Sequence, residues 1–322
     1  MIEKQTKLRP LTRSAQPLIH CITNPISIHD CANIILAAGG RPIMAEHPAE
    51  VAEITSRAQA LALNLGNITD ARMESMPKAL ETAARLHLPV MLDLVGTACS
   101  SLRYEFAQKL MTIHMPQLLK GNMSELLAMS GQTAHAIGID AGAQDVLTDA
   151  NCSHLKKLFQ EKAAQWNTTL LITGKKDMVV SPDKCAFITN GTPAMSQITG
   201  TGCMLGMICA TYLAVTDPFT AAVTAATEFG IAGEKAEKNS SGPGSFQVEL
   251  LDQFYPISLN ISAFSLYYFR PAHLRQLSSR KHNCQHKCRR IRNRTCIHHT
   301  VNSHKQWENN DQRQQKDHLS CH

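Results

Sequence analysis

Short apolar runs alternate with longer segments of helical periodicity along most of this chain, and no other feature limits its fold as strongly. The short runs, rich in aliphatic and β-branched residues, lie at 17–22, 61–65, 89–95, 117–119 and 169–172. Segments whose apolar residues recur near helical spacing lie between them, at 26–38, 70–86 and 153–166. Strands that alternate with helices in this way predict a mostly parallel sheet with helices on both faces. We therefore predict an α/β fold.

The second half of the chain departs from this alternation. Two strand-like runs, 178–181 and 185–189, are separated by Pro182 and Asp183, which predicts a hairpin at one edge of the sheet. Helices are expected at 202–215 and 218–238, followed by a Gly-Pro-Gly turn at 242–244. Residues 1–254 contain no linker-like stretch, so we predict a single domain there.

The positive charge is concentrated in the last part of the chain. There are 32 Lys and Arg against 26 Asp and Glu, a net charge of +6, but twelve of the basic residues and only three of the acidic ones follow Tyr255. The body is thus slightly acidic, and its charge does not indicate a nucleic-acid surface. Residues 255–322 lack apolar periodicity, so we predict a basic tail that is disordered or derived from a shifted reading frame. There are two alternatives for this tail. One is zinc binding, although the spacing of the candidate ligands fits no common zinc motif; they are Cys284, Cys288, Cys296, His298 and His299. The other is nucleic-acid binding through charge alone.

The sequence does not predict a membrane-bound or secreted protein. The longest apolar run, 203–215, is shorter than the ~20 residues of a membrane-spanning helix. The first ten residues, MIEKQTKLRP, lack the apolar core of a secretion signal. The eleven cysteines are scattered and odd in number, so we expect reduced thiols and a cytoplasmic location.

A glycine-rich stretch precedes the helix expected at 202–215. It reads ITGTGCMLG, and Thr199, Gly200 and Gly202 lie just before the apolar helical pattern. Such a turn exposes backbone N–H groups, and the following helix N-terminus adds a partial charge of about +0.5. The stretch therefore predicts an anion cradle that holds a phosphate group. The alternative is a tight turn before a buried helix.

Three charged residues lie in or after the apolar strands. Asp93 is embedded in VMLDLVG, and Lys120 begins KGNMSE, which ends at Glu125. A buried carboxylate needs a metal ion, a basic partner or a helix end, because an unpaired buried charge is costly. Asn122 and Glu125 have the spacing of a helix-capping pair. The functional interpretation is that Lys120 binds phosphates and that Glu125 helps Asp93 to hold Mg²⁺ through water.

Cys203 is expected in the first turn of its helix, where the helix dipole favours a thiolate. A catalytic cysteine of a hydrolase needs a nearby base, and no histidine of the body stands in a cysteine-protease context. Two interpretations therefore remain. Cys203 is either a small buried residue or a group that borders an acceptor hydroxyl beside the anion cradle.

Eight short motifs occur in order between residues 17 and 254. They are PLIHCITNPIS (17–27), PIMA (42–45), LNLG (63–66), LDLVG (92–96), KGNMSE (120–125), LITG (171–174), TGTGC (199–203) and GPGSF (242–246). Together they resemble the motifs of the hydroxyethylthiazole kinases, ribokinase-like enzymes of thiamin salvage, although any one alone is a weak signal. The resemblance implies the three-layer α/β fold of ribokinase-like enzymes over about residues 17–254.

The same resemblance implies that ATP, with Mg²⁺, phosphorylates the primary alcohol of 4-methyl-5-(2-hydroxyethyl)thiazole. The implied roles are Met44 and Asn24 in the thiazole pocket, Lys120, Thr173 and Thr199 at ATP, Asp93 and Glu125 at Mg²⁺, and Gly200, Gly202 and Cys203 around the transferred phosphoryl group and the alcohol. Cys203 stands where related sugar kinases have a catalytic aspartate. A homotrimer with sites at its subunit interfaces is also implied.

Two residues depart from the family pattern. Lys120 replaces the usual arginine, which keeps the charge but loses the two-pronged hydrogen bonding of a guanidinium. Leu94 replaces the usual proline after the strand aspartate. The alternative functions are another ribokinase-like activity, namely a hydroxymethylpyrimidine kinase or a nucleotide-dependent dehydratase, and a catalytically impaired protein that binds nucleic acid through its basic tail.

Overall fold

The computed structural model describes residues 2–257 and 266–268. Over these residues it contains one sheet of nine strands in the order β2-β1-β3-β4-β5-β6-β7-β8-β9. The strands are β1 (Leu18–Ile22), β2 (Arg41–Ile43), β3 (Ala60–Asn64), β4 (Val90–Asp93), β5 (Leu118–Asn122), β6 (Thr169–Thr173), β7 (Asp177–Val180), β8 (Cys185–Ile188) and β9 (Leu266–Tyr268). All pairs from β2 to β6 are parallel, and those from β6 to β9 are antiparallel. The predicted mostly parallel sheet is confirmed.

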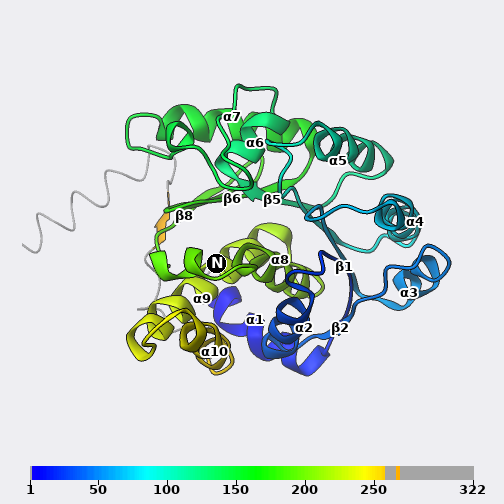
Figure 1. Ribbon diagram of the computed structural model, residues 1–322, viewed down its shortest axis with the longest axis horizontal. Helices are drawn as coiled ribbons and strands as arrows, with labels where there is room; N and C mark the ends of the chain where they lie inside the picture. The colour runs from blue at the N-terminus through cyan, green and yellow to red at the C-terminus, as the bar shows by residue number, and fades with distance from the viewer. Residues whose placement is uncertain (1, 258–265, 269–322) are drawn as a thin grey trace, which may run out of the picture. The chain divides into compact units, whose positions relative to one another are not determined.

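Helices cover both faces of the curved sheet (Figure 1). The outer layer consists of α3 (Val51–Arg57), α4 (Asp70–Arg85), α5 (Ser101–Ile113), α6 (Met123–Met129) and α7 (Cys152–Trp166). The inner layer consists of α1 (Ile2–Ala15), α2 (Ile28–Ala38), α8 (Thr201–Leu213), α9 (Pro218–Asn239) and α10 (Pro243–Phe254). Two 3₁₀ turns, η1 (Ala143–Asp145) and η2 (Pro193–Gln197), lie in connecting segments. The three-layer architecture expected from the sequence is confirmed.

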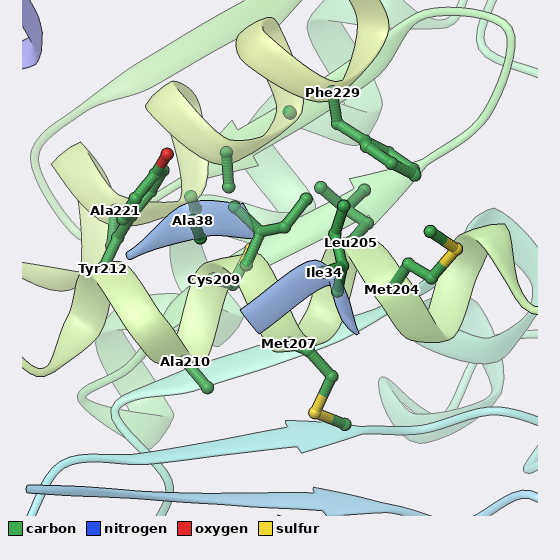
Figure 2. Packing of buried hydrophobic residues seen from close by; sticks show 14 of the residues in the cluster. Ile34, Ala38, Met204, Leu205, Met207, Cys209, Ala210, Tyr212, Ala221 and Phe229 are labelled. Atoms are coloured by element: carbon green, nitrogen blue, oxygen red, sulfur yellow. The ribbon is translucent and has the colours of Figure 1, made fainter. Parts of the chain in front are cut away.

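Helix α8 forms the centre of the inner core. Every residue from Met204 to Leu213 is buried, which is typical of a helix that is surrounded by protein on all sides. Figure 2 shows Met207 directed toward the strands and Phe229 of α9 close to Leu205. Because α8 is held on all sides, the backbone at its exposed N-terminus is fixed relative to the sheet. This matters for the glycine-rich stretch that begins the helix.

Several elements differ from the expectation. The turn expected at 242–244 is instead the start of α10, with Gly242 as the cap and Pro243 in the first turn. Proline fits there because the first helical N–H has no partner within the helix. Helices α1, α3 and α5 and strand β2 were not expected. Their sequences are short or polar, and α1 contains Pro10, so periodicity alone does not reveal them.

The hairpin expected at one sheet edge is confirmed as β7 and β8, although β9 pairs beyond it. The remaining tail, 258–265 and 269–322, lies outside the described residues, as do the tail cysteines considered as zinc ligands. Among the helices that the structure describes, none is long and apolar enough to span a bilayer.

Candidate active site

The carboxyl ends of three neighbouring strands bring polar side chains together. Asn64 ends β3 and is paired in register with Asp93, which ends β4, and Asp93 is in turn paired with Lys120 of β5. Strand β5 extends to Asn122, so Lys120 lies within the strand rather than after it. Ligands of open α/β sheets bind beyond this edge. The fold therefore places these residues where a substrate would be held.

Asp93 and Lys120 form a buried ion pair. The Lys120 Nζ lies 2.9 Å from the Asp93 Oδ2, and both side chains are almost fully buried. Burial alone lowers the pKa of Lys120, but Asp93, together with Cys203 and Glu125, raises it above the ordinary lysine value. The ammonium group therefore stays charged inside the protein.

The other oxygen of Asp93, Oδ1, is buried without a hydrogen-bond partner in the described part of the chain. A buried carboxylate oxygen normally has a partner, so this atom fits a bound cation. Mg²⁺ typically uses one or two carboxylates and completes its shell with water and phosphate oxygens. Among the described residues there is no cluster of three or more His, Cys, Asp or Glu that could hold a metal ion by itself.

Glu125 lies at the start of α6 and closes a capping box. Its Oε2 accepts the N–H of Asn122 at 2.7 Å, while the Asn122 side chain accepts the N–H of Glu125. Its Oε1 accepts the N–H of Gly96 at 2.7 Å. Burial and the nearby Asp93 raise the pKa of Glu125 to about 7, although these N–H bonds oppose the shift. With both oxygens engaged, Glu125 can reach a cation through water more readily than directly.

The glycine-rich stretch caps α8 as expected. Gly200 is the N-cap residue and has a left-handed backbone, φ +87°, and Met204 donates its N–H to the Gly200 carbonyl. The N–H groups of the next three residues belong to the first turn, where helices leave donors free. A Cβ added at Gly202 would lie 3.3 Å from the Lys120 Nζ, so the lysine reaches the helix N-terminus. Thr199 is exposed just outside this turn.

Cys203 lies in the first turn of α8 and is half-buried. Its sulfur accepts two hydrogen bonds at 3.3 Å, one from the Asn24 Nδ2 and one from the Asn64 Nδ2. Asn24 follows β1 and is buried. Cys203, Asn24 and the Asp93–Lys120 pair thus meet at one point, as the resemblance implies. Asn64 was not singled out from the sequence, although its place at the end of an apolar run within LNLG was the available signal.

A cleft of about 510 Å³ opens beyond the ends of β5 and β6, where Met123 and Thr173 line it. One wall is the 145–149 segment with Ala141, and the other is 173–176 with Thr189. Thr173 is paired in register with Asn122, the last residue of the strand that contains Lys120, so the cleft lies at the same edge of the sheet as the Asp93–Lys120 pair. The volume is in the range of a small-molecule site.

Asp145 anchors the first wall of this cleft. Its Oδ2 accepts the Ser124 hydroxyl at 2.5 Å and the His135 N–H at 2.7 Å, and its Oδ1 lies 2.8 Å from the His135 Nδ1. Burial alone would raise the pKa of Asp145, but these hydrogen bonds outweigh it and lower the pKa. Since Ser124 belongs to α6, the wall is tied to the helix that follows Lys120.

Met44 lies at the far side of the site. It follows β2, which is separated from β3 by β1, and it is half-buried against the inner core. Met44 and Asn24 are therefore at the same edge of the sheet as Asp93, and Thr173 lies on the opposite side of Lys120. Met44 and Thr173 thus lie on opposite sides of the Asp93–Lys120 pair along the sheet edge.

Comparison with known proteins identifies the family. The model of the hydroxyethylthiazole kinase family matches residues 10–260. The chain belongs to this family. Hydroxyethylthiazole kinase 2 of Clostridium botulinum strain 657 is 43% identical over 255 residues, which cover 79% of this chain and 96% of that protein. Hydroxyethylthiazole kinase of Thermoanaerobacter pseudethanolicus is 37% identical over 260 residues, covering 79% and 95%.

Solved structures agree with the fold. A hydroxyethylthiazole kinase protein from Pyrococcus horikoshii OT3 superposes with a TM-score of 0.74 at 31% identity, covering 83% of this chain and all of that one. A ribokinase-like superfamily protein from Enterococcus faecalis V583 superposes with a TM-score of 0.56 at 14% identity, over 76% of this chain and 90% of that one. The ribokinase-like fold predicted from the motifs is therefore confirmed.

Proposed function

We propose that the protein transfers the terminal phosphoryl group of ATP to the primary alcohol of 4-methyl-5-(2-hydroxyethyl)thiazole. The main support for this proposal is that three features lie together at one edge of the sheet. They are the helix N-terminus capped by Gly200, the buried Asp93–Lys120 pair and Cys203. Phosphoryl transfer depends mainly on positioning and charge stabilisation. These groups supply both.

The polyphosphate would lie between the cleft and the cradle. Thr173 borders the 510 Å³ cleft, and Lys120 bridges from Asp93 to the start of α8. The first-turn N–H groups after Gly200 would hold the transferred phosphoryl group, and Thr199 would lie at its outer side. Gly202 keeps this space open because any side chain there would approach Lys120.

Mg²⁺ is the cofactor that the site fits. The unpartnered Oδ1 of Asp93 would bind it, and Glu125 would contact it through water. When bound, the ion offsets the negative charge of the phosphates. Lys120 and the cradle stabilise the same charge from the protein side.

The alcohol would approach from the side of Asn24 and Met44. Its oxygen forms the new bond to the terminal phosphorus while the bond to the bridging oxygen breaks and ADP leaves. In its thiolate form Cys203 would take up the proton of the alcohol and become a thiol. A weak acceptor suffices, because the transition state of such transfers is loose and the proton leaves late.

Two further features extend this proposal. A homotrimer with sites at its subunit interfaces is expected from the family resemblance, and a cytoplasmic location is expected from the sequence. Equilibrium sedimentation of the purified protein tests the first. Fractionation of cells that express the chain tests the second.

An ADP-release assay with the thiazole alcohol tests the function itself. It should be run on the full chain and on a version that ends at Ile257, because Ile257 is buried and shorter versions would open the core. Both should release ADP only when the alcohol is present. Turnover of a hydroxymethylpyrimidine alcohol or of a hydrated nicotinamide nucleotide, with none of the thiazole, would contradict the proposal. The nucleic-acid alternative predicts binding of RNA or DNA that disappears in the shorter version.

A further inference from the structure

We propose that Asn64 is a positioning residue that fixes Cys203 and Asp93 relative to one another. It touches neither of the expected substrates and would act through these two side chains. The inference rests on the proposed function, since Cys203 and Asp93 matter to it as the groups that face the alcohol and the cation. Four hydrogen bonds of the buried Asn64 amide support this inference.

The Asn64 amide is fully buried and uses its whole hydrogen-bonding capacity. Its Nδ2 donates to the Asp93 Oδ2 at 3.1 Å and to the Cys203 sulfur at 3.3 Å. Its Oδ1 accepts the Asn24 Nδ2 at 3.0 Å and the Gly66 N–H at 2.9 Å. An amide has two donor hydrogens and two acceptor lone pairs, so no position on it is free. Its orientation is therefore fixed from both ends.

The first consequence concerns Asp93. Asn64 and Lys120 both bind the Oδ2 of this carboxylate, at 3.1 and 2.9 Å. Because both donors bind one oxygen, the other oxygen, Oδ1, has no hydrogen-bond partner among residues 2–257 and 266–268. Asn64 thus helps to decide which carboxylate oxygen is available to a cation.

The second consequence concerns Cys203. Asn24 and Asn64 each donate one N–H to its sulfur at 3.3 Å. Replacing one of these donors by a carboxylate oxygen would place a negative charge against the sulfur and repel a reacting thiolate there. The two donors also occupy the side of the sulfur that faces the sheet. The sulfur is therefore fixed in place in the first turn of α8, where the alcohol is expected.

The surroundings of Asn64 leave it little freedom. The Asn24 Oδ1 accepts both the N–H and the hydroxyl of Ser27, at 3.1 and 3.2 Å. A Cβ added at Gly66 would lie 2.8 Å from the Asn64 Oδ1 and 2.9 Å from the Asn24 Nδ2. The two amides are thus held between the start of α2 and the turn after β3. A rigid amide of this kind is suited to positioning.

Replacement of Asn64 by aspartate tests the inference. Asn64→Asp keeps the size and an oxygen for Asn24 and Gly66, but it removes the amide that donates to both Asp93 and Cys203. We expect kcat to fall about ten-fold or more, which is the usual effect of losing hydrogen bonds to charged groups. The KM values for ATP and thiazole should stay within about three-fold of those of the unaltered protein. Asn64→Ser, which retains one donor and adds no charge, should show a smaller loss of kcat.

A second readout needs neither metal nor nucleotide. Iodoacetamide alkylation of Cys203, followed by mass spectrometry of its peptide, should be about ten-fold or more slower in Asn64→Asp than in the unaltered protein. A merely structural defect would loosen the site and make alkylation faster. Alkylation of Cys203 at the unaltered rate, or faster, in Asn64→Asp would overturn the inference.

Asn190 offers a matched control. It is partly buried, and its Nδ2 donates to the Glu234 Oε1 of α9 at 3.2 Å. Asn190→Asp should leave both kcat and Cys203 alkylation unchanged. If the unaltered enzyme does not phosphorylate the thiazole, the proposed function fails, while the alkylation rates still decide whether Asn64 governs Cys203.

Discussion

Replacement of Gly200 by alanine would perturb the cradle at its first residue. Gly200 has φ +87°, and a Cβ added there would lie 2.8 Å from the Ser27 Cβ. A left-handed backbone costs an ordinary L-residue roughly 1–2 kcal/mol. Carbon atoms pack best at about 3.5–4.0 Å, so Ser27 or the start of α8 must also move. Such overpacking adds roughly 1–3 kcal/mol, which gives a total of about 2–5 kcal/mol.

This displacement would be transmitted to the reacting groups. Ser27 donates its N–H and hydroxyl to Asn24, and Asn24 donates to the Cys203 sulfur. We therefore expect Gly200→Ala to lower kcat/KM by about 30-fold or more, the equivalent of 2 kcal/mol or more. Its Tm should fall by several degrees, at about 2–4 °C per kcal/mol for a domain of this size. ADP release and thermal unfolding measure the two effects.

Gly131 separates the two contributions. It also has a left-handed backbone, φ +75°, but a Cβ added there would have no neighbour within 4 Å. Gly131→Ala should therefore lose roughly 1–2 kcal/mol of stability from backbone strain and keep its kcat/KM. If Gly200→Ala lost no more activity and stability than Gly131→Ala, the contact with Ser27 and the assignment of the cradle would both be wrong.

Three further outcomes are expected. Cys203→Ala should keep measurable turnover at saturating substrates, lowered at most about 100-fold, because a weak proton acceptor suffices. Gly200→Val should show no turnover. Equal turnover in the two variants would refute the assignment of the cradle. Asp145→Asn should raise the KM for ATP while kcat changes little, because the cleft wall loses the carboxylate that anchors it. An unchanged KM in ATP titrations would argue against nucleotide binding in this cleft. Burial raises the pKa of Glu228 to about 7, although Arg9 and Tyr212 oppose the shift. The native state therefore gains stability as pH falls from above 7 toward 4.5 and loses it as pH rises through 7, and Glu228→Gln should weaken this dependence in denaturant unfolding at pH 5.5 and 8.5. A dependence that stays the same in the variant would show that Glu228 does not contribute.

The parts of the fold that could be predicted are those whose sequence pattern matches their burial. Strands β3 and β4 are fully buried and appear as continuous apolar runs. Helix α8 is equally apolar and was predicted nearly to its observed ends. Helix α1 was not predicted, because its sequence is polar overall and contains a proline. Tertiary contacts hold it in place, through Arg9, which forms a buried ion pair with Glu228 at 3.1 Å and lies over the Phe254 ring.

The candidate site divides in the same way. Asp93 and Lys120 could be selected because charged residues in apolar strands are rare and require partners. Their pairing with each other could not be predicted, because it depends on the order of β4 and β5 in the sheet and on their register. Asn64 was missed for a related reason. An asparagine at a strand end is common, and its importance appears only when β3, β4 and α8 bring its four partners together.

The Asp93–Lys120 pair also explains why lysine can replace the arginine usual at this position. Burial alone would lower the pKa of Lys120, and the adjacent carboxylate reverses that shift. Lys120 therefore keeps its charge even when no phosphate is bound. An arginine would keep its charge without a carboxylate partner, because its intrinsic pKa is high. The two-pronged geometry of arginine is lost, but in the proposed function the backbone N–H groups at the start of α8 would provide directed hydrogen bonds to a phosphate. Lys120 then needs to supply only charge, and its contact distance to the Gly202 position shows that it lies close enough to the cradle to do so.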